Sequence, residues 1–318
     1  MHVKRAYLPN RITFHSLIIP VIFSVFACNE PPSDMPPDES MIEFNLQGHR
    51  GARGLLPENS IPSFIKALEF GVQTLELDVS ISADQEVIVT HEPWISSGIC
   101  SHADGRPVGE DEERSLNIYE LTAEEVAGYD CGSRGHGGFP GQARVSTIKP
   151  VLRDVVEAVD NYVTEHSIPA PVFNVEIKSS LQGEGVYHPG PEEFVSIVHA
   201  QLVELGIRDR TTIQSFDPRA LEAMHLLDPE IAIGWLVGNE DGFEANMDRL
   251  TFVPDYYSPS HRLVSGQLTA AVHQAGMLLI PWTVNEADRM RELVDLGVDG
   301  LITDYPDRAR SLLNSLTK

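Results

Sequence analysis

The sequence is poor in cysteine, in basic residues and in long apolar runs. Cys28, Cys100 and Cys131 are its only cysteines in 318 residues, and no histidines stand near them in the pattern of a zinc site. Lys and Arg number 23 against 47 Asp and Glu, which gives a net charge of −24. Such an acidic surface repels nucleic acid and anionic membranes, so we expect neither as a partner.

The first apolar run is too short to cross a membrane. It extends from Leu17 to Ala27, roughly 11 residues, whereas a spanning helix needs about 20. Basic residues precede the run, which is the pattern of a secretory signal over residues 1–27. Ala27-Cys28 at its end also resembles a bacterial lipoprotein signal, in which the cysteine is lipidated. We therefore expect export to the bacterial cell envelope and a lipid anchor at Cys28; the alternative is an ordinary cleaved signal.

Residues 28–43 differ from the remainder of the chain. They hold four prolines and several acids and have little apolar surface to bury, which predicts a disordered tether. From Phe44 onward, apolar residues recur with the spacing of packed secondary structure. The sequence thus predicts one folded domain over residues 44–318.

Short apolar strands alternate with amphipathic helices in this domain. The alternation predicts an α/β fold with a mostly parallel sheet. Nine strands are expected, at Asn45–Arg50, Thr74–Val79, Val87–His91, Val172–Lys178, Thr211–Phe216, Ile231–Val237, Tyr256–Pro259, Met277–Val284 and Gly300–Asp304. An eight-stranded barrel holds only eight of them. No helix fits between the second and third segments, so one of these two is expected to form a hairpin arm or to lie outside the ring.

Residues 92–149 depart from the alternation. They are rich in glycine and contain one helical stretch, near Ile118–Ala127. A long irregular insertion in a compact domain is typically a lid or a substrate loop, and we expect it to cap one face of the barrel. Cys100 and Cys131 both lie in it, and export would permit a disulfide between them, but the sequence leaves the bridge open.

Three acidic residues stand on two of the predicted strands. Glu76 and Asp78 are two positions apart, so their side chains point to the same face of one strand. Glu176 and Lys178 share a face of another strand in the same way. Clustered carboxylates inside a core are costly unless a cation lies between them. Oxygen ligands of this kind favour one divalent cation, Mg²⁺ or Ca²⁺. The alternative is an ordinary amphipathic strand whose acidic face is exposed to solvent.

Two histidines come at the ends of strands. His49 follows the first strand and His91 ends the third, and active sites of barrels lie where strands end. One imidazole would deprotonate a nucleophile while the other protonates a leaving oxygen. Arg50 offers a planar fork that matches the oxygens of a phosphate. A single strand-end histidine is more often a hydrogen-bonded core residue, so the inference depends on the joint pattern.

The order and spacing of these motifs resemble the glycerophosphodiester phosphodiesterase family. The resemblance covers nearly all of residues 44–318. It is carried by His49-Arg50-Gly51, Pro57-Glu58-Asn59-Ser60, Glu76-Leu77-Asp78-Val79, His91, Asn174-Val175-Glu176-Ile177-Lys178, Gln214-Ser215-Phe216-Asp217, Trp282-Thr283-Val284-Asn285 and Gly300-Leu301-Ile302-Thr303-Asp304.

The resemblance implies a TIM (β/α)8-type barrel that lacks a helix early in the chain. It implies metal binding by Glu76, Asp78 and Glu176, and acid–base catalysis by His49 and His91. Substrate binding would fall to cationic, acidic and aromatic side chains, namely Arg50, Lys178, Glu58 and Trp282. Glu92 departs from the pattern, because the family usually has Asp after the second histidine.

The implied activity is metal-dependent hydrolysis of a small-molecule glycerophosphodiester to glycerol 3-phosphate and an alcohol. One alternative is a phospholipase of related barrel type that acts on lyso-phospholipids, which needs an apolar cleft beside the site. Another is a non-catalytic lipoprotein that binds a phosphoryl ligand. Loss of a histidine or carboxylate from the pattern would favour the latter, and all are present.

Overall fold

A computed structural model describes residues 44–316. The expected signal (residues 1–27), the tether (28–43) and Cys28 lie outside this described part. Within residues 44–316, no helix is both long and apolar enough to cross a bilayer.

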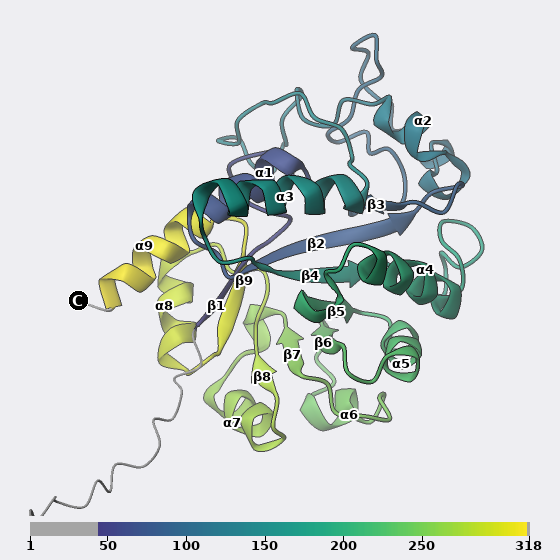
Figure 1. The fold of residues 1–318 in the computed structure, drawn as a ribbon. Coiled ribbons are helices and arrows are strands. Elements are labelled where there is room, and N and C mark those ends of the chain that lie inside the picture. Colours follow the sequence, from purple (N-terminus) through teal and green to yellow (C-terminus); the bar gives the residue numbers. More distant parts are fainter. Residues whose placement is uncertain (1–43, 317–318) are drawn as a thin grey trace, which may run out of the picture. The chain divides into compact units, whose positions relative to one another are not determined.

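The strands form one sheet that curls into a barrel (Figure 1). Eight of them follow the order β8-β7-β6-β5-β4-β2-β1-β9, and every pairing along this path is parallel. The strand bounds are β1 Asn45–Gly48, β2 Thr74–Ile81, β3 Val87–Val89, β4 Val172–Ile177, β5 Thr211–Ser215, β6 Ala232–Val237, β7 Tyr256–Pro259, β8 Leu278–Leu279 and β9 Gly300–Thr303.

Backbone hydrogen bonds continue the ring between β8 and β9. Asp299 N donates to Leu279 O at 3.0 Å, and Ile302 N donates to Pro281 O at 3.0 Å. Val284 N also donates to Ile302 O, although β8 ends at Leu279 and Trp282 makes only an isolated β-bridge to Ser260. The predicted TIM-type barrel is therefore confirmed, with an eighth strand much shorter than the expected Met277–Val284.

The surplus segment is β3, which lies outside the ring. It pairs with β2 and runs antiparallel to it, with Val79 opposite Val89 and Ile81 opposite Val87. The short link that excluded a helix between the two segments makes this hairpin. Since β2 extends to Ile81, β3 can turn back along its last residues.

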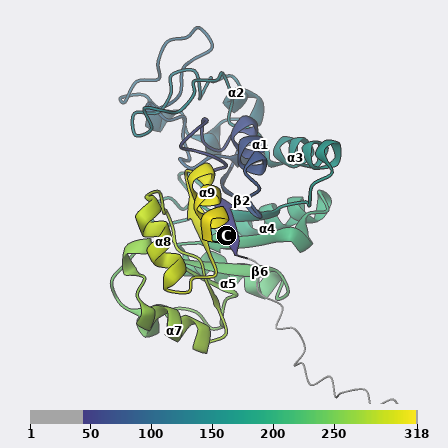
Figure 2. The same cartoon turned by 90° about the vertical axis from the view of Figure 1, so that its left-hand side faces the viewer.

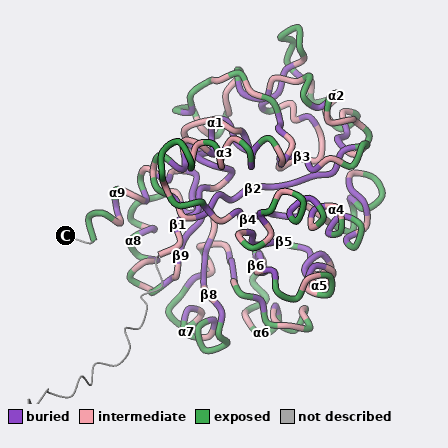
Figure 3. Tube along the Cα trace, viewed as in Figure 1, coloured by how far each residue is buried: buried purple, intermediate pink, exposed green. Residues whose placement is uncertain are grey.

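Helices other than α2, which belongs to the insertion, surround the barrel (Figures 1 and 2). In α1, Ser60 caps the N-terminus by accepting a hydrogen bond from Ser63 N, and Phe64, Ala67 and Leu68 face the core. The helix bounds are α1 Ile61–Glu69, α2 Ala123–Ala127, α3 Leu152–His166, α4 Pro191–Glu204, α5 Pro218–Leu227, α6 Phe243–Met247, α7 Gly266–Gln274, α8 Ala287–Asp295 and α9 Pro306–Leu316. Burial follows this arrangement, because the barrel strands are buried and the outer faces of the helices are exposed (Figure 3).

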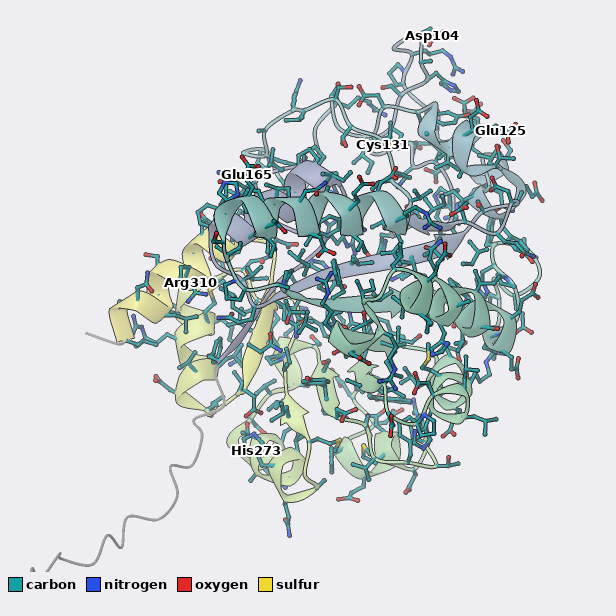
Figure 4. The ribbon with its side chains drawn as sticks, in the orientation of Figure 1. Asp104, Glu125, Cys131, Glu165, His273 and Arg310 are labelled. Carbon is teal, nitrogen blue, oxygen red and sulfur yellow. A yellow bond between two sulfur atoms is a disulfide. The ribbon has the colours of Figure 1, made fainter. Side chains whose placement is uncertain are left out.

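The insertion between β3 and α3 has its own small core. It contains two 3-10 turns, Glu113–Ser115 and Ile118–Glu120, besides α2. Its core consists of Ile88, Ile95, Ile99, Cys100, Val108, Ile118, Val126 and Cys131. Cys100 and Cys131 form a disulfide across 31 residues, which answers the question that the sequence left open. Cys131 lies within the insertion, whereas Asp104 lies at the outer tip of the insertion (Figure 4).

Candidate active site

The three predicted carboxylates meet at one point inside the barrel. In the parallel pairing of β2 with β4, Asp78 lies opposite Glu176, and Glu76 lies one pleat below on the same face. One ligand oxygen from each of the three residues lies within 4.8 Å of the others. All three are buried, with 7% or less of each residue exposed. The pleat of two neighbouring strands thus makes a compact oxygen cluster from residues 100 positions apart.

Hydrogen bonds from amides hold this cluster in place. Glu76 accepts one from Arg50 N at 2.9 Å and another from Gln214 Nε2 at 2.9 Å. Asp78 Oδ2 accepts from Asn59 Nδ2 at 2.9 Å. Asn59 adopts a positive φ of 51°, which turns its side chain from the start of α1 toward β2. The orientations of Glu76 and Asp78 are therefore set by residues from other segments.

The electrostatics of the cluster favour a bound cation. Burial, together with the charges of Asp78 and Glu176, raises the pKa of Glu76 well above its usual value. Burial also opposes the charged form of Asp78, but Arg50 and Lys178 outweigh it and hold the pKa of Asp78 well below its usual range. Among the described residues, the buried Asp78 Oδ1 accepts no hydrogen bond. A hard divalent cation fits this set of oxygen donors, and Glu76, Asp78 and Glu176 would hold it.

Two cations lie beside the carboxylates. Lys178 Nζ is 2.8 Å from Glu176 Oε1 and 3.7 Å from Asp78 Oδ1. Arg50 Nε is 3.1 Å from Asp78 Oδ2, and Arg50 Nη1 donates to Glu58 Oε1 at 2.8 Å. Both side chains line the same cavity as the carboxylates, where they can meet an anionic group.

Glu58 forms ion pairs with two arginines of the site. Its carboxylate is buried between Arg50 and Arg53, with Arg53 Nε 2.5 Å from Oε2, and Glu58 is not among the residues that line the cavity. The two arginines hold the pKa of Glu58 below its ordinary value against the effect of burial. Glu58 therefore positions both arginines in this structure, and its predicted part in substrate binding stays a prediction.

His49 is oriented by a carboxylate at the end of the last strand. Its Nδ1 lies 2.6 Å from Asp304 Oδ1, and its Nε2 lies 4.0 Å from Glu76 Oε2. Burial lowers the pKa of His49 more than Asp304 raises it. The imidazole is thus neutral near pH 7, with the nitrogen opposite Asp304 directed to the acidic cluster.

His91 reaches the site by a route that the sequence did not reveal. It follows β3, which is antiparallel, so it does not stand at the carboxyl end of a barrel strand. Thr90 N donates to Asp78 O at 2.9 Å, and this bond brings His91 back beside the acidic cluster. His91 Nδ1 lies 2.8 Å from Glu92 Oε1, and the pKa of Glu92 is about 2 because the contact with His91 outweighs burial.

The cavity between these groups has a volume of about 190 Å³. It is lined by both histidines, Glu76, Glu176, Arg50, Lys178 and Gln214, and on the apolar side by Phe216, Leu236 and Trp282. The Trp282 indole packs edge-on against Phe216 at 5.2 Å and donates to Ser258 O at 2.8 Å. The cavity therefore joins a charged half with an aromatic half, as a phosphate ester requires.

Comparison with known proteins agrees with this geometry. The model of the glycerophosphoryl diester phosphodiesterase family matches residues 49–308. The chain belongs to this family.

Several known proteins are similar to this chain along most of their own length. A glycerophosphodiester phosphodiesterase of Caldanaerobacter subterraneus is 28% identical over 85% of this chain and 96% of its own. A structure from Silicibacter pomeroyi, assigned to the glycerophosphoryl diester phosphodiesterases, is 28% identical with a TM-score of 0.75 and covers 86% and 94% of the two chains. A phosphodiesterase of Oleispira antarctica, solved with sn-glycerol-3-phosphate, shares the fold at 23% identity and a TM-score of 0.67, with 85% and 96% covered.

Several contributors to the site of this phosphodiesterase family member were not predicted from its sequence. Asp304 orients His49, and Asn285 donates to Asp304 Oδ2 at 2.7 Å. Gln214 and Asn59 hold the carboxylates, and Phe216 lines the cavity. Asn59, Gln214 and Asp304 belong to the motifs quoted above, so their position in those motifs was the available signal.

Proposed function

We propose that the protein hydrolyses glycerophosphodiesters to glycerol 3-phosphate and an alcohol, with the help of one divalent cation. A single observation carries this conclusion: two histidines, Arg50 and Lys178 line one small cavity together with Glu76 and Glu176 of the three-carboxylate cluster. The family of the chain and its relatives support the same activity.

The cation would be held by Glu76, Asp78 and Glu176, and the oxygen ligands suit Ca²⁺ or Mg²⁺. When bound, it supplies charge that stabilises a phosphoryl oxygen in the transition state. Arg50 and Lys178 bind the remaining phosphoryl oxygens and oppose the negative charge that grows on them. Trp282 and Phe216 pack against the carbon atoms of the glycerol arm.

The two histidines transfer the protons. The neutral His49, held by Asp304, accepts a proton from the attacking hydroxyl, and His91 gives a proton to the departing alcohol oxygen. The new bond joins the attacking oxygen to phosphorus, and the bond to the alcohol oxygen breaks. The attacking hydroxyl is that of water or of the neighbouring glycerol carbon. In the second case a cyclic phosphate forms first, and water then attacks its phosphorus and breaks the ring bond to the neighbouring glycerol oxygen, which gives glycerol 3-phosphate.

Hydrolysis of glycerophosphocholine, with and without a chelator, tests the proposal. We expect release of glycerol 3-phosphate that stops on chelation and returns with Mg²⁺ or Ca²⁺. His49→Ala should lose about 10²–10⁴-fold in rate, because a general base is removed. An active chelated protein, or full activity of His49→Ala, would contradict the metal or the acid–base role.

We also propose that the protein is exported to the bacterial cell envelope and anchored through a lipid on Cys28. The support is the basic and apolar pattern of residues 1–27. Labelled palmitate should enter the wild-type chain in bacteria and be absent from Cys28→Ala. Equal labelling of the two chains would contradict the anchor.

A further inference from the structure

A second opening adjoins the catalytic cavity on the side of His91. It is a groove of about 430 Å³. It shares His91, Glu176, Lys178 and Phe216 with the cavity, whereas His49 and Trp282 line the cavity alone. A phosphodiester has two arms on one phosphorus. Two openings that meet at the phosphate-binding Lys178 can therefore hold one arm each.

The cavity and the groove differ in size and in wall. The cavity is closed by Trp282 and, at about 190 Å³, suits the three carbons of glycerol. The groove is larger and is built from the start of the insertion and from residues 177–188. We propose, on the basis of the function above, that the groove binds the alcohol arm of the substrate and favours a polyhydroxylated ring over a quaternary ammonium.

Two aromatic side chains give the groove its flat walls. Trp94 comes from the insertion and Tyr187 from the segment between β4 and α4, and their rings lie edge to face at 5.3 Å. Asn117 Nδ2 donates to Val186 O at 2.7 Å and ties the two segments together. Because the walls are linked in this way, the groove is formed before the substrate arrives. Flat aromatic faces pack well against the C–H faces of a hydroxylated ring.

Arg114 is the residue that would distinguish a polyhydroxylated ring from a quaternary ammonium. Its guanidinium carbon lies 3.4 Å from the centroid of the Trp94 ring, so a cation already covers one face of the indole. Its nearest acid is Glu113, at 3.6 Å, and 58% of the Arg114 side chain is exposed. A quaternary ammonium against Trp94 would therefore meet like charge on Arg114, whereas the two acids that line the groove, Glu92 and Glu176, already pair with His91 and Lys178. Hydroxyl groups instead would accept hydrogen bonds from its guanidinium, and Gln182 and Ser179 line the groove nearby.

The test compares glycerophosphoinositol with glycerophosphocholine in the full-length protein. We expect a higher kcat/KM for the inositol ester. This preference should fall about tenfold in Arg114→Ala, since a charged hydrogen-bond donor to the ring is lost. Trp94→Ala should reduce kcat/KM for the inositol ester by a similar factor. Arg144→Ala is a matched control, because Arg144 is an exposed arginine of the same insertion that does not line the groove.

Several outcomes would overturn the inference. These are a wild-type preference for glycerophosphocholine, an unchanged preference in Arg114→Ala, and faster turnover of lysophosphatidylcholine that Trp94→Ala abolishes, which would place an acyl chain in the groove. A protein that hydrolyses none of these esters would contradict the proposed function instead. In that case the affinities of the two esters, measured by calorimetry, test the groove. Tighter binding of glycerophosphoinositol than of glycerophosphocholine, weakened in Arg114→Ala, would support the inference, and equal binding of the two esters would refute it.

Discussion

The Nδ1 atom of His49 lies 2.6 Å from Oδ1 of Asp304, although the two residues are 255 positions apart. His49 follows β1 and Asp304 follows β9, and these strands pair in parallel with Gly48 opposite Thr303. The register of two neighbouring strands thus puts an acid beside a histidine at the same end of the barrel. Asp304 keeps a pKa of about 2, because the contact with His49 outweighs burial.

Replacement of Asp304 by Asn should move the pH profile in a definite direction. Burial lowers the pKa of His49, while Asp304 raises it, so removal of the carboxylate should lower it further. The acidic limb of kcat/KM should then shift to lower pH. The rate itself should fall roughly 10²-fold or more, since the histidine tautomer is no longer fixed. A limb that moves to higher pH would contradict the role of His49 as a base.

The loss of rate in His91→Ala should depend on the leaving group of the substrate. An alcohol such as choline needs a proton as it departs, whereas 4-nitrophenolate does not. The variant should lose about 10²–10⁴-fold on glycerophosphocholine and much less on the 4-nitrophenyl ester of glycerol phosphate. Equal losses on the two esters, measured as kcat, would show that His91 is not the acid.

Glu76→Gln should change the pH dependence of stability in the metal-free protein. The pKa of Glu76 is raised in the folded state, so its protonated form stabilises the fold at low pH. This contribution is lost as pH rises from the ordinary value of 4.5 through the raised pKa, and Gln removes the loss. In chelator, the free energy of unfolding of wild type should thus fall more steeply above pH 4.5 than that of the variant.

The same variant should lose the response to metal. Mg²⁺ or Ca²⁺ stabilises a folded protein that binds it by RT ln(1 + [L]/Kd), so melting of wild type should shift upward with added cation. Glu76→Gln should show little shift. Glu165→Gln, an exposed change of the same type on α3 (Figure 4), should behave like wild type. An equal shift in both variants would place the cation elsewhere.

The disulfide of the insertion should stabilise the insertion or the whole domain, but it should take no part in catalysis. Cys100→Ser with Cys131→Ser opens a loop of 31 residues, which typically costs about 2–4 kcal/mol. Denaturant unfolding should show this loss, and reduced wild type should match the variant. Metal binding should persist, because none of the three carboxylates belongs to the insertion. Loss of metal affinity in the variant would link the insertion to the cation site.

Strand periodicity was enough to predict the acidic cluster. Glu76 and Asp78 are two residues apart, as are Glu176 and Lys178, so each pair faces the same way in any strand. Acids on one face of a buried strand favoured a cation, and the alternation of strands and helices predicted an α/β fold with a mostly parallel sheet, whereas the family resemblance implied the barrel. The first two of these conclusions depend only on local geometry, which each segment carries within itself.

Relations between distant segments required the folded structure. The antiparallel β3 returns His91 to Asp78, the pairing of β1 with β9 joins His49 to Asp304, and Glu58 turns to the two arginines and away from the cavity. Each of these three contacts depends on strand register, on turn geometry or on competition between charged partners. One residue of register shift reverses a strand's faces, and ion-pair choice depends on distances that only tertiary packing sets. The sequence by itself therefore determined which chemical groups were available and on which faces, and tertiary structure decided which of them meet.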